Sequence, residues 1–278
     1  MSLEAAPAAE LWRSAARGGL FTMQKRPDYG IDAPLVIVIQ LIVSASAFAL
    51  AVVVFALGVP HPLSIPLAEI GLVLGVNFLV NVAGMFWYSN IGKLRQRKRL
   101  LDLISWRGDE TVLDVGCGRG LLLIGVARRL TSGKAIGVDI WQQKSMVGNR
   151  PEAALENARL EGVAQRVEVQ DGDARRLPFP DASFDVVVSA LVLHNIPGQA
   201  GRQQAAREMA RVLKPGGQVA LLGIKHTNEC VRVLRESGLS DARRAAAGFL
   251  FWWFAVLTWG SVQFFRVTGK KVASATVA

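Results

Sequence analysis

A short apolar segment that ends in a glycine-rich turn constrains the fold of this chain most. The segment is Val112-Leu113-Asp114-Val115, and the turn is Gly116-Cys117-Gly118-Arg119-Gly120. The apolar run predicts a buried parallel strand, and glycines let the backbone turn sharply with positive φ at little cost. Open α/β sheets bind ligands at the carboxyl ends of such strands. We therefore expect a nucleotide-type site at this turn, with a helix beginning at Leu121.

From about residue 100 onward, strand-sized apolar runs alternate with helical stretches. This alternation predicts right-handed crossovers and a parallel sheet with helices on its faces. The expected strands are 111–115, 135–140, 166–170, 184–189 and 218–224, and the expected helices are 121–130, 151–160 and 200–213.

Two long apolar segments precede this α/β region. The run from Leu35 to Leu57 carries no charge, and its length matches the roughly 20 residues that cross a bilayer as a helix. A second run extends from Leu67 to Tyr88 and ends in two aromatic residues, which favour the headgroup zone. We therefore expect a two-helix transmembrane hairpin over 34–90, between an N-terminal tail (1–33) and a second domain (91–278).

Five cations fall within residues 93–99, directly after the second apolar segment. Loops rich in Lys and Arg beside membrane helices stay in the cytoplasm, and the connection between the two segments has neither residue. This asymmetry predicts a cell-membrane protein whose second domain is cytoplasmic. The net charge of +10 also fits nucleic acid. Because the cluster abuts a membrane segment and lacks interleaved aromatic residues, we expect it to contact anionic lipid and no nucleic acid.

Two acids follow the next two strands. Asp139 closes the second strand, nineteen residues after Gly120, where a carboxylate can accept both hydroxyls of a ribose. Asp173 follows the third strand, where it could accept from an adenine amino group. With the glycine turn, these acids predict an adenosine-type ligand. An NAD site is the rival interpretation, but its G-x-G-x-x-G pattern needs a glycine at the position of Leu121.

The two cysteines, Cys117 and Cys230, form no disulfide framework, which fits a reducing compartment. His226 lies four residues before Cys230, but two ligands do not make a metal site, so we expect no metal. Cys117 suits the turn as a small residue, and we do not interpret it as a nucleophile.

Four motifs now stand in order along the chain: VLDVGCGRG, GVDI, GDARRLPFPDASFDVVVSALVLHNI and RVLKPGG. Over about residues 100–271, the chain resembles the class I S-adenosylmethionine-dependent methyltransferases in these motifs and their spacing. It is most similar to the branch that contains ubiquinone and menaquinone methyltransferases. The resemblance implies an α/β fold with a Rossmann-like seven-stranded sheet whose last strand is antiparallel. The apolar hairpin lies outside the resemblance.

The resemblance also implies which residues bind S-adenosyl-L-methionine as the cofactor. Asp114 and the turn glycines would line its methionine part, and Asp139 would take the ribose hydroxyls. Ile140 or Trp141 would pack on the adenine, Asp173 would meet its amino group beside the Ala174 backbone, and the end of the fourth strand would lie along the cofactor. The implied cofactor-binding residues are Asp114, Gly116, Gly118, Gly120, Asp139, Ile140, Asp173, Ala174 and Leu191.

A third uncharged run, from Ala245 to Phe265, is also long enough to span a membrane. Cations flank both of its ends, and Gly260-Ser261 divides it into two strand-sized pieces. Because the implied fold needs two more strands, we expect them here, with Phe265 to Lys270 in the last one. The alternatives are a third span and an aromatic hairpin that dips into the membrane interface.

Together these patterns predict a membrane-anchored methyltransferase that acts on a small lipophilic acceptor, such as a quinone, a lipid or a hydrophobic metabolite. The alternatives are methylation of a soluble small molecule and a non-catalytic, membrane-held scaffold with the same fold. Methyl transfer from a sulfonium needs positioning and a dry site, and it needs a base only where the acceptor must lose a proton. His194, after the fourth strand, is the weak candidate for that base.

Overall fold

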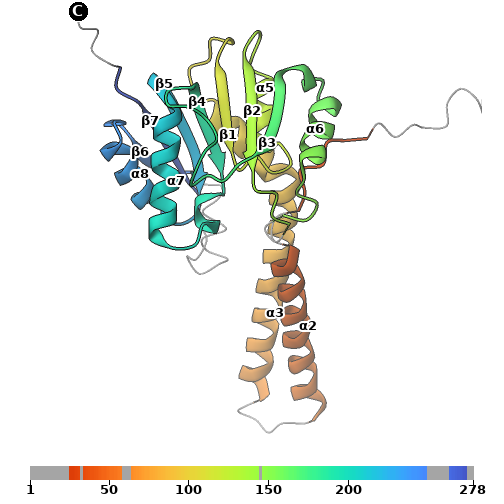
Figure 1. Cartoon of the computed structure of the whole chain (residues 1–278). Coiled ribbons are helices and arrows are strands. Elements are labelled where there is room, and N and C mark those ends of the chain that lie inside the picture. Colours follow the sequence, from red (N-terminus) through yellow and green to blue (C-terminus); the bar gives the residue numbers. More distant parts are fainter. Residues whose placement is uncertain (1–24, 32–33, 58–63, 144–145, 249–262, 274–278) are drawn as a thin grey trace, which may run out of the picture.

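The computed structural model describes residues 25–31, 34–57, 64–143, 146–248 and 263–273. These residues form a seven-stranded sheet with helices on both faces, and a pair of long helices projects from it (Figure 1). The predicted α/β class with a Rossmann-like sheet is confirmed. Most of the N-terminal tail lies outside the described residues.

The strands lie in the order β3-β2-β1-β4-β5-β7-β6, so the order reverses between β1 and β4. The pairs among β1 to β5 are parallel, and β7 runs antiparallel to both β5 and β6. An antiparallel last strand is what the family resemblance implied. The strands are β1 (Thr111–Val115), β2 (Lys134–Asp139), β3 (Val167–Asp171), β4 (Phe184–Ala190), β5 (Leu213–Gly223), β6 (Arg243–Ala246) and β7 (Phe265–Lys270).

Each face of the sheet has its own buried apolar cluster. Val112 in β1 belongs to one cluster and its neighbour Leu113 to the other, because successive side chains of a strand point to opposite faces. Leu100 and Leu123 pack in the first cluster, and Met209 and Leu234 pack in the second. The first face is covered by α4 (Lys93–Leu101), α5 (Leu121–Ala127) and α6 (Pro151–Leu160), and the second by α7 (Gln199–Val212) and α8 (Thr227–Glu236).

Two boundaries differ from the predicted ones in an informative way. Strand β5 begins at Leu213, well before the predicted start at 218, because Leu213 already pairs with Phe184 ahead of an irregularity in register. Near the C-terminus, β7 is the predicted strand, Phe265–Lys270. Strand β6 lies at Arg243–Ala246, largely before the run in which we expected it. Most of that run, residues 249–262, lies outside the described residues.

The projecting helices α2 (Pro34–Ala56) and α3 (Ser64–Trp87) pack side by side at close range (Figure 1). A Cβ added at Gly71 would lie 2.8 Å from the Ala47 carbonyl oxygen, and one at Gly75 would lie 2.9 Å from the Phe48 ring. The Ser44 hydroxyl donates to the Gly75 carbonyl at 2.8 Å. Small residues at the contact therefore set the spacing, as they do in pairs of membrane helices.

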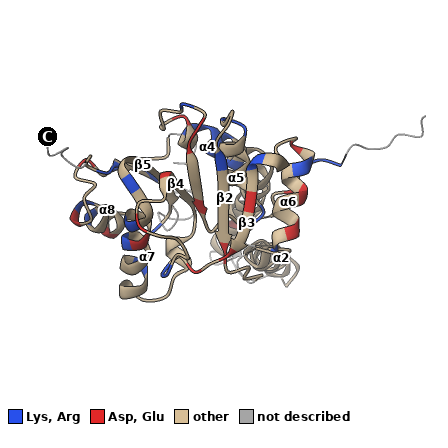
Figure 2. Ribbon diagram, turned by 45° about the horizontal axis from the view of Figure 1, so that its top comes forward, with Lys and Arg blue, Asp and Glu red and all other residues tan. Residues whose placement is uncertain are grey.

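Both helices of this hairpin are long and apolar enough to cross a membrane. Their large apolar side chains mostly face outward; Leu35 is 70% exposed and Phe55 is 74% exposed. Figure 2 shows no charged residue on α2, whereas both signs of charge are spread over the α/β domain. The core helix of a water-soluble protein buries such side chains, so this surface requires lipid or a partner.

Helix α3 continues through a π-helical turn, η1 (Tyr88–Gly92), into α4, so one helix runs from Ile65 to Leu101. Leu100 and Leu101 have no solvent exposure and belong to the core beside the sheet. The hairpin is therefore joined to the domain by helix rather than by a loop. Single π turns within helices often mark functional positions.

Residues 25–31, which precede the first apolar helix, lie against the α/β domain. Tyr29 is buried, its hydroxyl donates to Glu161 at 2.9 Å, and Arg97 lies 5.6 Å from the centroid of its ring. The Lys93 ammonium donates to the carbonyl oxygens of Tyr29, at 2.9 Å, and Gly30. Lys93 and Arg97, two of the five cations that we expected at a lipid surface, thus make contacts within the protein.

Candidate active site

The turn after β1 has the backbone that its glycines predict. Gly116, Gly118 and Gly120 have φ angles of 72°, 52° and 87°. A Cβ at Gly116 would lie 2.1 Å from Cγ2 of Val192, so no side chain fits there. The Gly116 amide donates to the Val138 carbonyl at 2.7 Å, which ties the turn to the end of β2.

Asp139, the last residue of β2, faces this turn. Its Oδ2 accepts from the Gly118 amide at 2.9 Å, and its Oδ1 accepts from the Trp141 amide at 2.7 Å and from Asn149 Nδ2 at 3.1 Å. The carboxylate is thus held beside the glycine turn, which is the placement that a ribose-binding acid needs. Its role in binding ribose stays a prediction.

Asp114 is fully buried at the start of the same turn. Its Oδ2 accepts from the Leu123 amide at 2.8 Å, whereas its Oδ1 has no partner among the described residues. Burial raises the pKa of this carboxyl to about 8; the Leu123 amide opposes the rise and the Asp139 charge adds to it. A cation placed beside Asp114 would favour the ionised form.

Asn149 is a site residue that sequence reasoning missed. We interpreted its neighbourhood only as the start of α6, but Arg150 is the N-cap and the Asn149 side chain turns toward Asp139 instead. Asn149 Oδ1 is buried without a partner among the described residues. It lies 3.9 Å from the position of a Cβ on Gly118. A single Asn before a helix carries no sequence signal for such a role.

Asp173, the acid after β3, forms an ion pair with a neighbouring arginine. Asp173 Oδ2 lies 2.6 Å from Arg175 Nη2, and hydrogen bonds from Arg175 lower the pKa of the Asp173 carboxyl. The Trp141 indole N–H donates to Asp171, at 2.6 Å, rather than to Asp173. Ile140 is 52% exposed, and Ala174 is buried. The adenine-binding roles of Asp173, Ile140 and Ala174 therefore stay predictions.

The end of β4 lies beside the same turn. The Ser189 hydroxyl donates to the Val115 carbonyl at 2.7 Å, which joins β4 to the end of β1. Leu191 has a φ of 58°, and its amide donates to the Leu222 carbonyl at 2.8 Å. This backbone carries the next residues past the turn, where Val192 fills the space left by Gly116.

His194 lies in the short helix η3 (Leu193–Asn195) that follows. Burial lowers the pKa of its imidazole to about 4, and the nearby charges of Lys225 and His226 lower it further. Its Nδ1 is buried and has no partner among the described residues. The ring is therefore neutral at physiological pH and is a weak base.

Both cysteines are buried thiols. Burial raises the pKa of Cys117 well above its ordinary value and that of Cys230 to about 12, so neither is a thiolate near pH 7. Across the ranges that the structure describes, no group of three or more His, Cys, Asp or Glu side chains is arranged to hold a metal ion.

Residues 113–221, from β1 to β5, match the protein family described as a methyltransferase domain. This part of the chain is therefore similar to methyltransferase domains. A demethylmenaquinone methyltransferase from Lactobacillus johnsonii is 32% identical to this chain over 143 residues, which are 51% of this chain and 55% of that protein. The chain thus spans about half the length of this curated relative.

Solved structures with the same fold align with about two thirds of this chain. The cyclase SpnF aligns with a TM-score of 0.52 and 21% identity, covering 65% of this chain and 82% of that one. A geranyl diphosphate C-methyltransferase from Streptomyces coelicolor aligns with a TM-score of 0.51 and 16% identity, covering 64% and 79%. A cyclase and a methyltransferase thus share this fold, so the reaction must be argued from the site.

Proposed function

We propose that this chain binds S-adenosylmethionine at the glycine turn and transfers its methyl group to a small lipophilic acceptor at a membrane. The match of residues 113–221 to a methyltransferase domain supports the reaction class. The observation that carries the proposal is that the Asp139 carboxylate lies at the turn together with two buried acceptor atoms, Asp114 Oδ1 and Asn149 Oδ1, that have no partner among the described residues.

These residues fit a cationic ligand that carries hydroxyl groups. Asp114 Oδ1 and Asn149 Oδ1 are buried acceptors without partners among the described residues. An unpaired buried polar group costs about 1–3 kcal/mol, so a ligand that donates hydrogen bonds there is stabilised. In this proposal Asp114 lies on the side of the positively charged methionine part, and Asp139 and Asn149 lie on the side of the ribose hydroxyls.

When bound, the cofactor would supply a methyl group on positively charged sulfur. The electron pair of the S–CH3 bond would stay on sulfur as a thioether, the acceptor would supply the electron pair of the new bond to carbon, and the proton that the acceptor loses would pass to solvent. The chain contributes position and a dry site. Gly116 keeps the turn close to Val192, and Ser189 holds the end of β4 against β1. His194 is neutral near pH 7 and can take up a proton only as a weak base.

A membrane-borne acceptor is supported by the hairpin. We propose that α2 and α3 cross the bilayer and that residues 91–278 lie on the cytoplasmic side, where the basic residues 93–99 follow α3. The exposed apolar side chains of the hairpin favour the hydrocarbon of a bilayer over water. The relative named a demethylmenaquinone methyltransferase makes a quinone-type acceptor the first to test.

Titration calorimetry of S-adenosylmethionine into the full chain in nanodiscs tests the cofactor site. Wild type is expected to bind, and Asp139→Asn, which keeps the shape but removes the charge and one acceptor, is expected to bind roughly tenfold or more weakly. The matched control is Glu168→Gln on the neighbouring strand, where an exposed carboxylate pairs with Lys134. Absence of binding by the folded wild type, or equal affinity of all three proteins, would refute the site.

Transfer of a labelled methyl group tests the acceptor class. The full chain in vesicles is expected to label demethylmenaquinone after its reduction, or another component of a total lipid extract, faster than water-soluble phenols. Preferred labelling of soluble phenols would leave the cofactor site intact and overturn the lipophilic acceptor. Loss of the chain from membranes on carbonate washing would overturn the transmembrane hairpin.

A further inference from the structure

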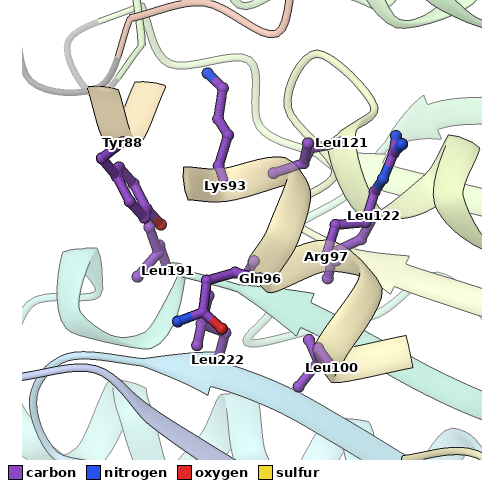
Figure 3. A pocket seen from close by; sticks show the side chains of 10 residues that line it. Tyr88, Lys93, Gln96, Arg97, Leu100, Leu121, Leu122, Leu191 and Leu222 are labelled. Carbon is purple, nitrogen blue, oxygen red and sulfur yellow. The ribbon is translucent and has the colours of Figure 1, made fainter. Parts of the chain in front are cut away.

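A small cavity, about 30 Å³, lies between α4 and the carboxyl ends of β4 and β5 (Figure 3). Its walls are mostly apolar and include Ala190, Leu191 and Leu222. Leu121, the first residue after the glycine turn, also lines it. The cavity therefore lies next to the proposed cofactor site. It is one strand away from the β1–β4 position, where the strand order reverses and where α/β sheets bind ligands.

The polar side chain in this cavity is the unusual feature. Gln96 is 1% exposed, and neither its Nε2 nor its Oε1 has a hydrogen-bond partner among the described residues. Figure 3 shows it reaching from α4 into the space beside Leu191 and Leu222. Each unpaired end costs about 1–3 kcal/mol, which a methionine or leucine at this position would avoid. An amide here is suited to a ligand group that both donates and accepts hydrogen bonds.

The two cations at the edge of the cavity, Lys93 and Arg97, already form hydrogen bonds within the protein. Lys93 donates to the carbonyls of Tyr29 and Gly30, and Arg97 hydrogen-bonds the Tyr29 hydroxyl at 3.2 Å. Their charges are therefore directed at the segment ahead of the hairpin. This arrangement disfavours an anionic group in the cavity and favours a neutral polar one, such as a phenol or a quinone oxygen.

The cavity also lies within reach of the bilayer in the proposed topology. Tyr88, at its edge, directly follows the last residue of the apolar helix α3. At 1.5 Å of rise per residue, Gln96 lies roughly 14 Å beyond that point along the helix. The headgroup layer is about 5–8 Å deep on each side of a bilayer, so Gln96 lies roughly 6–9 Å beyond it. The ring and the first part of the tail of an acceptor would have to extend past the headgroups to reach Gln96, while the rest of the tail stays in the hydrocarbon.

We propose that Gln96 binds the ring oxygen of a hydroxylated aromatic acceptor that enters from the bilayer past Tyr88. The cavity holds one oxygen-sized group, and the ring would lie toward Tyr88. Gln96 Nε2 donates to a carbonyl or phenolic oxygen, and Oε1 accepts from a hydroxyl. This inference rests on the proposed function and names Gln96 as a residue that determines acceptor specificity.

The test compares two probes in nanodiscs: a naphthohydroquinone with a two-isoprene tail, and the same tail on naphthalene without ring oxygens. Wild type is expected to bind the oxygenated probe about tenfold more tightly. Gln96→Met replaces the amide with an apolar side chain of similar length. In this variant, the ratio of the affinities for the oxygenated and the oxygen-free probe is expected to fall to about two or less. The melting temperature should not fall, because two unpaired buried groups are removed. Gln218→Met is the control, since its amide bonds Ser105 instead.

Several results would overturn this assignment. An unchanged ratio in Gln96→Met would mean that water or nothing fills the cavity. A loss of S-adenosylmethionine affinity with an unchanged ratio would place Gln96 in the cofactor site. The probes report binding rather than turnover, so failure of the proposed methyl transfer appears separately, as absent labelling or absent cofactor binding in wild type.

Discussion

Arg119 of the glycine turn and Asp28 ahead of the hairpin form an ion pair, with Arg119 Nη2 2.5 Å from Asp28 Oδ2. Arg119 Nε also donates to the Asp28 carbonyl at 2.8 Å, and Asn157 Nδ2 donates to the carbonyls of both residues. The segment before the first apolar helix is therefore fastened to the candidate active site. The hairpin is thus tied to the domain at its first helix by this segment, and at its second helix through α4.

Removing this ion pair should expose the segment to proteolysis. Arg119→Met is expected to raise the rate of tryptic cleavage after Lys25 about fivefold, because an ion pair of this kind is worth about 1 kcal/mol and cleavage follows the opened population. The measurement is limited proteolysis of the full chain in nanodiscs. Arg107→Met, which loses an exposed pair with Asp109, should leave the rate unchanged. Equal rates in all three proteins would show that Arg119 does not hold the segment.

Alanine substitutions at two glycines with nearly equal φ distinguish the cost of backbone strain from the cost of side-chain crowding. Gly116 and Gly162 have φ angles of 72° and 70°, but a Cβ at Gly162 meets nothing within 4 Å. Gly162→Ala should lower the free energy of unfolding by about 1–2 kcal/mol, from strain alone. Gly116→Ala adds a clash with Val192 and should cost about 2–5 kcal/mol. Urea unfolding measures both, and similar losses in the two variants would contradict the packing seen at the turn.

The raised pKa of Asp114 should make the free energy of unfolding fall as the pH rises. Its folded pKa of about 8 exceeds the ordinary 3.8, so between these values the folded chain holds a proton that the unfolded chain has lost. Its stabilising contribution is full below about pH 4 and is lost as the pH rises through about 8. Wild type should therefore lose stability relative to Asp114→Asn between pH 5 and 7.5, with a limiting slope of about 1.4 kcal/mol per pH unit.

Urea unfolding at several pH values measures this difference. Saturating S-adenosylmethionine should reduce it, because a cation favours the carboxylate. A difference that does not change with pH would mean that Asp114 is ionised in the folded chain.

His194 should contribute little to the reaction. Because its pKa is about 4, the pH dependence of methyl transfer should show no inflection between pH 6 and 7 from this residue. His194→Asn should slow transfer less than tenfold and leave cofactor affinity unchanged. Rates from pH 5.5 to 8.5 in nanodiscs decide this. A hundredfold loss with normal binding would instead make His194 the general base.

The sequence predicted the parts of the site that depend on local backbone. Gly116, Gly118 and Gly120 required positive φ, and their position after an apolar strand placed them at the carboxyl edge of the sheet. Asp139 could be placed beside them because parallel strands end at the same edge. These inferences needed only the spacing of residue types along neighbouring strands.

The parts that were missed depend on contacts between distant segments. Lys93 bonds Tyr29 across 64 positions, so the run of cations at 93–99, which has the pattern of a solvated face, is partly interior. Gln96 lies within that run, and its neighbours in sequence conceal its burial. Asp173 pairs with Arg175, two residues later. This ion pair competes with the predicted binding of an adenine amino group, and the family motif alone does not reveal it.

The unbroken helix from Ile65 to Leu101 has a kinetic consequence for a membrane-anchored enzyme. A flexible tether would let the domain tumble over the bilayer, whereas a helix keeps its cavity at one height and facing one way. Under the proposed function, the acceptor would then arrive by lateral diffusion within a leaflet. Diluting the acceptor with inert lipid should slow turnover even when its amount per volume of solution is constant, because encounters depend on surface density.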